Sequence, residues 1–289
     1  MSIRNIRELV AAENDGNFWF STWRKTPTQT TGSGIWFDLA MSPGNPAPLY
    51  YAASPNVAIA LAQSTDGGIP HGGNVAQLGY KKYLKQIQAM TVTATAVPLP
   101  MILLDYLLFY PFVDMSVTDE QPMTNIVTLP RYPTGKGVQI MPVEVAGQSG
   151  VGNPQFFVTY TNSNGVSGRV TPTVACNTQI VNGTLITSAR NTARSSGPFL
   201  ALQPGDVGVR KIDSVTFLTA DVGLIAFVLV YPIENFAIRT IDAPIERSAL
   251  IDFGDMPVIE DDAYLNLICC PQGTLSAAPI HGTITTIWN

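Results

Sequence analysis

The pattern of apolar and polar positions is most regular in residues 90–119, where it predicts two successive strands. Residues 91–96 alternate threonine with valine or alanine, which is the two-residue period of a strand with one polar face. The Pro-Leu-Pro sequence at 98–100 is expected to end this strand. Residues 101–109 are then almost wholly apolar and stop at Tyr110-Pro111. The flanking prolines and the aromatic residues favour a buried core strand over a buried helix.

A weaker copy of this stretch follows in the second half of the chain. Four features recur in the same order: an apolar strand, Tyr-Pro, Met-Pro-Val and a second apolar strand. They lie at residues 103–108, 110–111, 141–143 and 156–160 in the first copy, and at 224–229, 231–232, 256–258 and 264–270 in the second. These matches predict an internal duplication with two equivalent core strands, one in each sheet or sandwich. Asp105 aligns with Ala226, so the repeat requires no carboxylate there. We expect Asp105 either at a subunit contact or in one buried hydrogen bond.

Two short helices are predicted outside this core. Residues 2–13 place four apolar side chains on one face, behind Ser2 as the capping residue. Residues 80–90 place Leu84 and Ile87 inward, as a second short helix would. The outward side of that segment carries the densest basic cluster of the chain, which is either a solvated face or a contact with an acidic neighbouring subunit. Its members are interface candidates: Lys81, Lys82 and Lys85.

Further strands recur at intervals of roughly 8–12 residues, as in β-sandwiches. The candidates are residues 126–129, 138–145, 156–160, 168–174, 179–181, 184–186, 199–202 and 279–289. Asn182-Gly183 is the strongest hairpin signal. The repeated helical patterns of a parallel α/β sheet are missing. We therefore predict an all-β jelly roll or β-sandwich, built as one sandwich or as two related sandwiches or sheets, with a short N-terminal helix and an extended arm.

The arm and the sandwich divide the chain into three parts. Residues 1–78 are expected to form the helix and a loop-rich arm, followed by the two sandwich halves at 79–203 and 204–289. The arm is rich in Gly, Pro and Thr but also in aromatic residues, so it is too apolar for a disordered tail. It either folds back on its own domain or lies on a neighbouring subunit. Its aromatic side chains are candidate interface anchors: Trp19, Trp23 and Trp36.

Composition favours a protein whose surface is covered by other subunits. Charged residues make up 13 % of the chain, about half of the usual ~25 %. A surface with so few charges is expected to expose contiguous apolar patches, which often mark a contact with another protein. The net charge of −5 and the sparse basic residues disfavour nucleic-acid binding. Because no apolar run reaches the ~20 residues that a bilayer requires and no signal-peptide pattern is present, we expect no membrane partner and synthesis in a cytoplasm.

No pattern in the sequence predicts catalysis, a cofactor or a metal site. His71 and His281 each precede a glycine in turn-like sequence, so a His-based triad is not expected. The glycine pairs at 32–34 and 135–137 lack the frame of a phosphate-binding loop. The acidic residues near 119, 252 and 260 are interpreted as solvated loop carboxylates. A calcium site at 260–262, or a hydrolase built from two distant carboxylates, is the alternative.

The cysteines point to a reducing environment. Cys176, Cys269 and Cys270 show neither a disulfide framework nor metal-ligand spacing. We interpret them as small buried apolar side chains.

One stretch carries a resemblance to a known class. Residues 99–114, Leu-Pro-Met-Ile-Leu-Leu-Asp-Tyr-Leu-Leu-Phe-Tyr-Pro-Phe-Val-Asp, followed by Asp119-Glu-Gln-Pro-Met, resemble virion structural proteins of tailed bacteriophages. Residues 204–217 share that character. The resemblance implies a non-enzymatic capsid decoration (cement) protein, located in the virion after assembly in the host cytoplasm. Its implied partners are further copies of itself, as a homotrimer, and the major capsid protein or other virion proteins.

Two alternatives stay open beside this interpretation. One is a tail, baseplate or adaptor protein of the same kind of particle. The other is a carbohydrate-binding, receptor-recognition β-sandwich, which would need an exposed aromatic platform such as Trp36 or Trp288.

Overall fold

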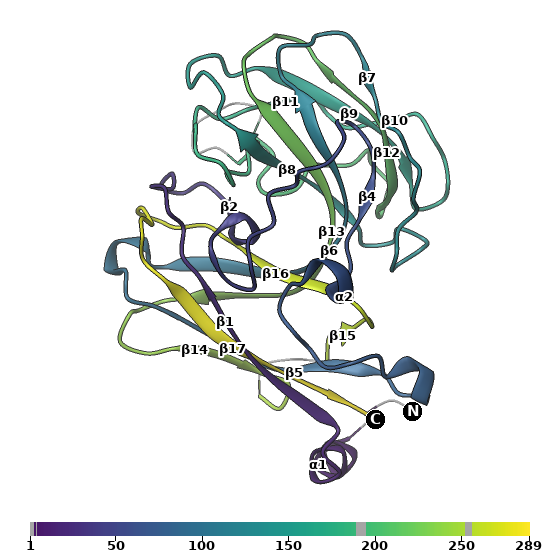
Figure 1. The fold of residues 1–289 in the computed structure, drawn as a ribbon, viewed down its shortest axis with the longest axis vertical. Coiled ribbons are helices and arrows are strands. Elements are labelled where there is room, and N and C mark those ends of the chain that lie inside the picture. Colours follow the sequence, from purple (N-terminus) through teal and green to yellow (C-terminus); the bar gives the residue numbers. More distant parts are fainter. Residues whose placement is uncertain (1–2, 4, 189–194, 252–255) are drawn as a thin grey trace.

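The protein folds into two lobes, one above the other in the view of Figure 1. The computed structural model describes residues 3, 5–188, 195–251 and 256–289. In these residues the chain is mainly β, with three antiparallel open sheets, a short N-terminal helix and a β-sandwich arrangement. The predicted fold class is therefore confirmed.

We name the sheets by their places in Figure 1: the lower and the upper sheet each belong to one lobe, and the shared sheet extends into both. The shared sheet runs, in order, β2 (Phe37–Asp38), β16 (Tyr264–Cys269), β6 (Leu99–Asp114), β13 (Leu224–Ile238) and β8 (Gln139–Ala146), with β4 (Ile59–Ala60) beside β6. The lower sheet runs β14 (Ile245–Ser248), β5 (Lys82–Thr91), β17 (Ile280–Trp288), β1 (Phe18–Lys25) and β3 (Gly44–Asn45), with β15 (Val258–Ile259) beside β5. The upper sheet runs β10 (Arg169–Val170), β9 (Gln155–Asn162), β12 (Val209–Phe217) and β7 (Gln121–Pro122), with β11 (Val174–Ala175) beside β9.

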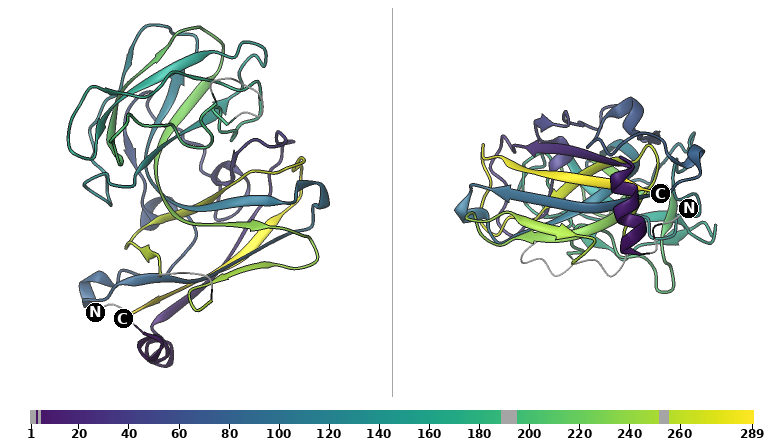
Figure 2. Two further views of the ribbon diagram at one scale, coloured as in Figure 1. Left: turned by 180° about the vertical axis from the view of Figure 1, so that it is seen from behind. Right: turned by 90° about the horizontal axis from the view of Figure 1, so that it is seen from below.

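The helices are short. They are α1 (Ile6–Asn14), α2 (Gln63–Asp66) and the 3-10 turns η1 (Leu39–Met41), η2 (Ala76–Leu78) and η3 (Ala94–Ala96). The side chain of Asn5 caps α1 by accepting the N–H groups of Arg7 and Glu8. The predicted cap, Ser2, lies outside the described residues. Seen from below, α1 lies across the strands of the lower sheet (Figure 2, right).

Strands β6 and β13 pair along their whole lengths and pass through both lobes. In the upper lobe they supply Tyr110 and Phe227 to the core, and in the lower lobe they supply Met101 and Ile238. Each fully buried side chain of this size contributes roughly 1.5–3 kcal/mol. The two cores are therefore built on one pair of strands.

The Tyr-Pro pairs lie inside these strands, which corrects the prediction that they end them. At Pro111 and Phe112, β6 has one residue more than β13 between paired positions, and Phe112 has a φ of 57°. Another shift in register follows Pro232 in β13. A proline cannot donate to the ladder, and a β-bulge accommodates the missing donor without ending the strand.

The helix predicted at residues 80–90 is wrong, because residues 82–91 form the strand β5. Leu84 and Ile87 both face the lower core, although they are three residues apart. The reason is a bulge: Leu84 pairs with Thr286 and Gln86 with Thr285, so Lys85 is an extra residue. The extra residue changes the strand's spacing of two into three, which is the spacing expected of a helix.

The N-terminal arm packs on its own chain. Tyr51 and Leu61 are fully buried against β6, β13 and β16, and the N–H of Leu61 donates to the carbonyl of Leu107 at 2.9 Å. The hydroxyls of Tyr51 and Tyr106 both donate to the buried carboxylate of Asp38, at 2.5 and 2.6 Å. Of the two placements left open by the sequence, the structure has the arm on its own lobes.

The two predicted sandwich halves are interleaved. Each sheet holds strands from residues 79–203 and from 204–289. The two strands of the predicted duplication are neighbours in the shared sheet, so the expectation of one per sheet is wrong.

Four of the predicted strands are absent from the described structure. Residues 126–129, 179–181 and 199–202 form none, and of residues 91–96 only Thr91 belongs to a strand, because residues 94–96 form the 3-10 turn η3. Residues 184 and 185 make only isolated bridges, so Asn182-Gly183 does not join a pair of strands. Instead, Gly183 has a φ of 95°, and an added Cβ there would lie 2.8 Å from the ring of Phe37. The glycine serves both a β-turn, in which the N–H of Thr184 donates to the carbonyl of Val181 at 3.0 Å, and a close approach to the arm.

Asp105 lies in a buried ion pair at the centre of β6. Its carboxylate accepts two hydrogen bonds from Arg131, at 2.7 and 2.8 Å, and a third from the N–H of Tyr264 at 3.1 Å. Arg131 also donates to the carbonyls of Leu61 and Tyr106 at 3.0 Å. Burial raises the pKa of Asp105 to about 6, and Arg131 opposes that rise. Of the two expected roles, Asp105 thus has the buried one, with three bonds in place of one.

Replacing Arg131 by methionine should destabilise the protein strongly. The Asp105 carboxylate would stay buried without its counter-charge, which typically costs about 3–5 kcal/mol. The matched control is Lys211→Met, which breaks the surface pair with Asp213 and should change stability by less than about 1 kcal/mol. Urea unfolding of both variants measures the difference. Equal effects would contradict the assigned role of Arg131.

Candidate functional site

The two histidines do not form a catalytic arrangement with a nucleophile. His71 is buried, with Nε2 2.9 Å from the carbonyl of Ala263 and Nδ1 3.1 Å from Nζ of Lys82. Burial lowers the pKa of His71 to about 4, so the ring is neutral and accepts from the lysine through Nδ1. His281 lies on the outer face of the lower sheet. Among the described residues, no group of three or more His, Cys, Asp or Glu side chains could hold a metal ion.

The three predicted lysines lie in different environments. Lys82 is buried and donates to the carbonyl of Gly73 at 2.7 Å and to Asp261 at 3.2 Å. Lys85 pairs with Glu13 of α1. Lys81 is exposed. The cluster expected from the sequence therefore does not form, because neighbouring residues of a strand point to opposite faces.

The predicted tryptophan anchors are similarly divided. Trp23 is 2 % exposed and belongs to the lower core, so its burial and that of Lys82 remove both residues from any partner surface. Trp19 is 47 % exposed at the start of β1. Trp36 is partly buried and lines a cleft. For Trp19, Trp36, Lys81 and Lys85 an interface role stays a prediction.

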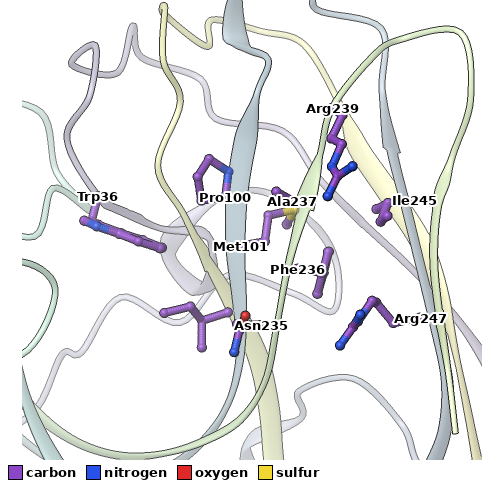
Figure 3. A pocket seen from close by; sticks show the side chains of 10 residues that line it. Trp36, Pro100, Met101, Asn235, Phe236, Ala237, Arg239, Ile245 and Arg247 are labelled. Atoms are coloured by element: carbon purple, nitrogen blue, oxygen red, sulfur yellow. The ribbon is translucent and has the colours of Figure 1, made fainter. Parts of the chain in front are cut away.

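The cleft beside Trp36 has a volume of about 510 Å³ and is shown in Figure 3. Its walls come from β6, β13 and β14, with Met101 and Phe236 between Trp36 and two arginines, Arg239 and Arg247. Nη2 of Arg247 lies 3.6 Å from Oε1 of Glu234, which offsets part of its charge. The cleft is suited to an apolar group that carries a negative charge.

The upper lobe exposes a group of apolar side chains that we call the loop-tip surface. Its members are more than half exposed: Val151, Ile180, Leu218 and Val222. Contacts between the loops bring them together. A Cβ added at Gly150 would lie 3.1 Å from Cγ2 of Ile180, and one at Gly152 would lie 2.8 Å from Oδ2 of Asp221. The N–H of Leu218 donates to the carbonyl of Gln155 at 2.7 Å.

A buried carboxyl group supports the loop that carries Val151. Glu144 is fully buried at the end of β8, and its Oε1 accepts the N–H of Gln148 at 3.0 Å. Its Oε2 has no hydrogen-bond partner among the described residues. Burial raises the pKa of Glu144 to about 8, while the bonds from Gln148 oppose the rise. At neutral pH the group is therefore mainly protonated.

Sequence reasoning did not identify the loop-tip surface or Glu144. The available signals were weak: a lone valine between Gly150 and Gly152, and a carboxylate between Val143 and Val145. A valine between glycines is ordinary in a turn, and a carboxylate between valines is ordinary in a half-exposed strand. Only the contacts between loops that are distant in the sequence show that these residues belong to one surface and its support.

The comparisons with known proteins found no relative. No protein-family model, no curated protein and no solved structure matches the chain. In the described part of the chain, no helix is long and apolar enough to cross a membrane.

Glu144 should make the stability of the protein pH-dependent. Its folded pKa of about 8 lies above the ordinary value of 4.5, so the folded state keeps a proton that the unfolded state has lost. The free energy of unfolding should therefore fall as the pH rises from about 6.5 to 7.5, by up to about 1.4 kcal/mol per pH unit. This range lies above the pKa of about 6 of Asp105.

Replacing Glu144 by glutamine should remove this slope, because the amide is neutral throughout. Unfolding at several pH values measures it, and Glu120→Gln on an exposed loop is the matched control. An unchanged slope in the Glu144→Gln variant would disprove the assignment.

Proposed function

We propose that the protein is a non-enzymatic virion structural protein, a decoration protein that stabilises a bacteriophage head. The loop-tip surface carries this proposal. Apolar side chains more than half exposed on adjoining loops are costly in water and mark a contact with another protein. The low charged fraction of 13 % and the resemblance of residues 99–114 to phage virion proteins support the same interpretation.

The arrangement of the lobes suits a protein that links other subunits. The loops of the loop-tip surface adjoin the first residue of β13, Leu224, which pairs with Asp114 and Ala146. The loops that carry Val151 and Val222 are therefore anchored in the shared sheet, which reduces the entropy that they lose on binding. A usual interface covers about 800 Å² per partner. The loop-tip surface would form its apolar centre, with the polar loop backbone as the rim.

Binding of this kind stabilises a shell by mass action, because the protein binds the assembled form and not the separated subunits. The proposed partners are the major capsid protein and further copies of the same chain, as a homotrimer. The runner-up is a tail, baseplate or adaptor protein. It would use the same surface on a different part of the particle.

Serine at Val151 and Leu218 should weaken attachment to the particle. Removal of two apolar anchors should lower the particle-bound fraction at least ~5-fold, as for central interface residues, with stability changed by less than ~0.5 kcal/mol because both side chains are exposed. The matched control is Val166→Ser. Val166 is also exposed, but lies by Asn162 at the other end of β9.

The measurement is quantification of the chain in gradient-purified particles and in the free lysate. Recovery with heads supports the decoration protein, and recovery with separated tails supports the runner-up. Recovery in the free fraction alone would contradict both. Sedimentation velocity as a single monomer at all concentrations would contradict the homotrimer.

A further inference from the structure

The outer face of the lower sheet carries two ordered rows of polar side chains. The register of the strands aligns Thr22 of β1 with Thr283 of β17, Gln88 of β5 and Glu246 of β14. The neighbouring row aligns Asn45 of β3 with Arg24, His281 and Met90. Apart from Glu246, the residues of both rows line one depression of about 650 Å³. That volume lies within the ~300–1,000 Å³ usual for sites of small ligands.

Hydrogen bonds within the face hold part of it in place. Gln88 accepts from the hydroxyl of Thr283 at 3.2 Å and donates to Glu246 at 3.0 Å. Gln86 donates to the other oxygen of the same carboxylate. The carboxylate of Glu246 is thus engaged at the rim, and the amides are oriented before any ligand arrives.

Two side chains on this face are left available. Within the described part of the chain, the guanidinium of Arg24 and the ring of His281 have no hydrogen-bond or ion-pair partner. Arg24 is exposed. Glu246 keeps its negative charge, because its partners are neutral amides, but it lies on β14, three strands away from β1 in the sheet. At the β1 side the charge available to a ligand is that of Arg24, and a guanidinium binds a carboxylate with two parallel bonds.

A glycine lies between the two rows. Gly282 of β17 pairs with Trp23 of β1 on one side and with Ala89 of β5 on the other. An added Cβ at Gly282 would lie 2.8 Å from the Trp23 ring and 1.9 Å from the carbonyl oxygen of Gln88. The indole fills the space of the missing side chain from the core side. The depression therefore has a rigid base, which favours a preformed site.

An aromatic ring adjoins the depression. Phe20 is 56 % exposed and stands two residues before Thr22, on the same face of β1. Its partner across the sheet is Thr285. An exposed ring next to hydroxyl and amide groups presents an apolar surface beside hydrogen-bonding groups. That combination suits a sugar ring, which has one apolar face and hydroxyl groups at its edge.

We infer that this face binds an oligosaccharide that carries a carboxylate. The sugar hydroxyls bond Thr22, Thr283 and Gln88, the carboxylate binds Arg24, and a neighbouring sugar stacks on Phe20. Extended peptides usually add to a free strand edge, whereas the polar rows cross β17 and β5, which have neighbours on both sides. The edge of β1 is free only before Arg24, where its pairing with β3 begins. Adjacent strands are about 4.8 Å apart, a spacing close to the length of one sugar ring.

This site is independent of the proposed attachment surface. The loop-tip surface lies in the upper lobe, beside the first residue of β13, and the polar rows lie on the lower sheet in the other lobe. A particle-bound copy could therefore present the polar face outward. Loss of saccharide binding and loss of particle binding would follow from different variants.

Titration of the full chain with an oligogalacturonate, by calorimetry, tests the inference. We expect saturable binding that weakens with added salt. Arg24→Ala should lower the affinity about tenfold or more, because a charge-assisted bidentate bond is lost. Thr283→Val, which keeps the shape of the side chain, should lower it several-fold. Maltohexaose, which is neutral, should bind at least tenfold more weakly than the acidic probe.

The matched control is Arg239→Ala, in the cleft of Figure 3, which should leave the affinity unchanged. Loss of binding in Arg239→Ala with none in Arg24→Ala would assign the ligand to that cleft and overturn the inference. Equal binding of maltohexaose would also overturn it, as would the absence of heat at about 1 mM probe. Circular dichroism of each variant shows that the fold is kept, so a lost affinity reports the contact.

Discussion

Both lobes depend on the pairing of β6 with β13. This pair supplies side chains to the upper core on one stretch and to the lower core on the other. The ion pair of Asp105 and Arg131 stands near its middle and joins it to β16 and the arm. A buried charge pair adds little net stability over apolar packing. Its geometry demands one arrangement of these elements, so it fixes how the arm and the sheet meet.

The elements that could be predicted are those whose signal is local. The continuous apolar run of β6, the alternating tail of β17 and the helix α1 each follow from their own residues. The errors occurred where a neighbouring strand changes the meaning of the spacing. The bulge at Lys85 makes β5 look like a helix, and Pro111 interrupts the pattern of β6 without interrupting the strand.

The candidate surfaces are harder to predict because their residues are distant in the chain. Val151 and Leu218 meet only through loops at the ends of different strands. Thr22, Thr283 and Gln88 become neighbours only through the register of three strands. Each residue alone is ordinary. A pairing register displaced by one residue would turn these polar side chains into the core, and no local sequence pattern specifies that register.

The position of β17 has a consequence for synthesis. This strand lies between β5 and β1 in the lower sheet, yet it follows all the other described elements in the chain and is made after them. The strands of the upper sheet and its core all precede residue 239. During synthesis, all upper-lobe strands therefore leave the ribosome before β17 does. At that stage β1 and β5 still lack the strand that lies between them. During that interval the aromatic side chains of β1 face water, and a chaperone would find its binding site there and not in the upper lobe.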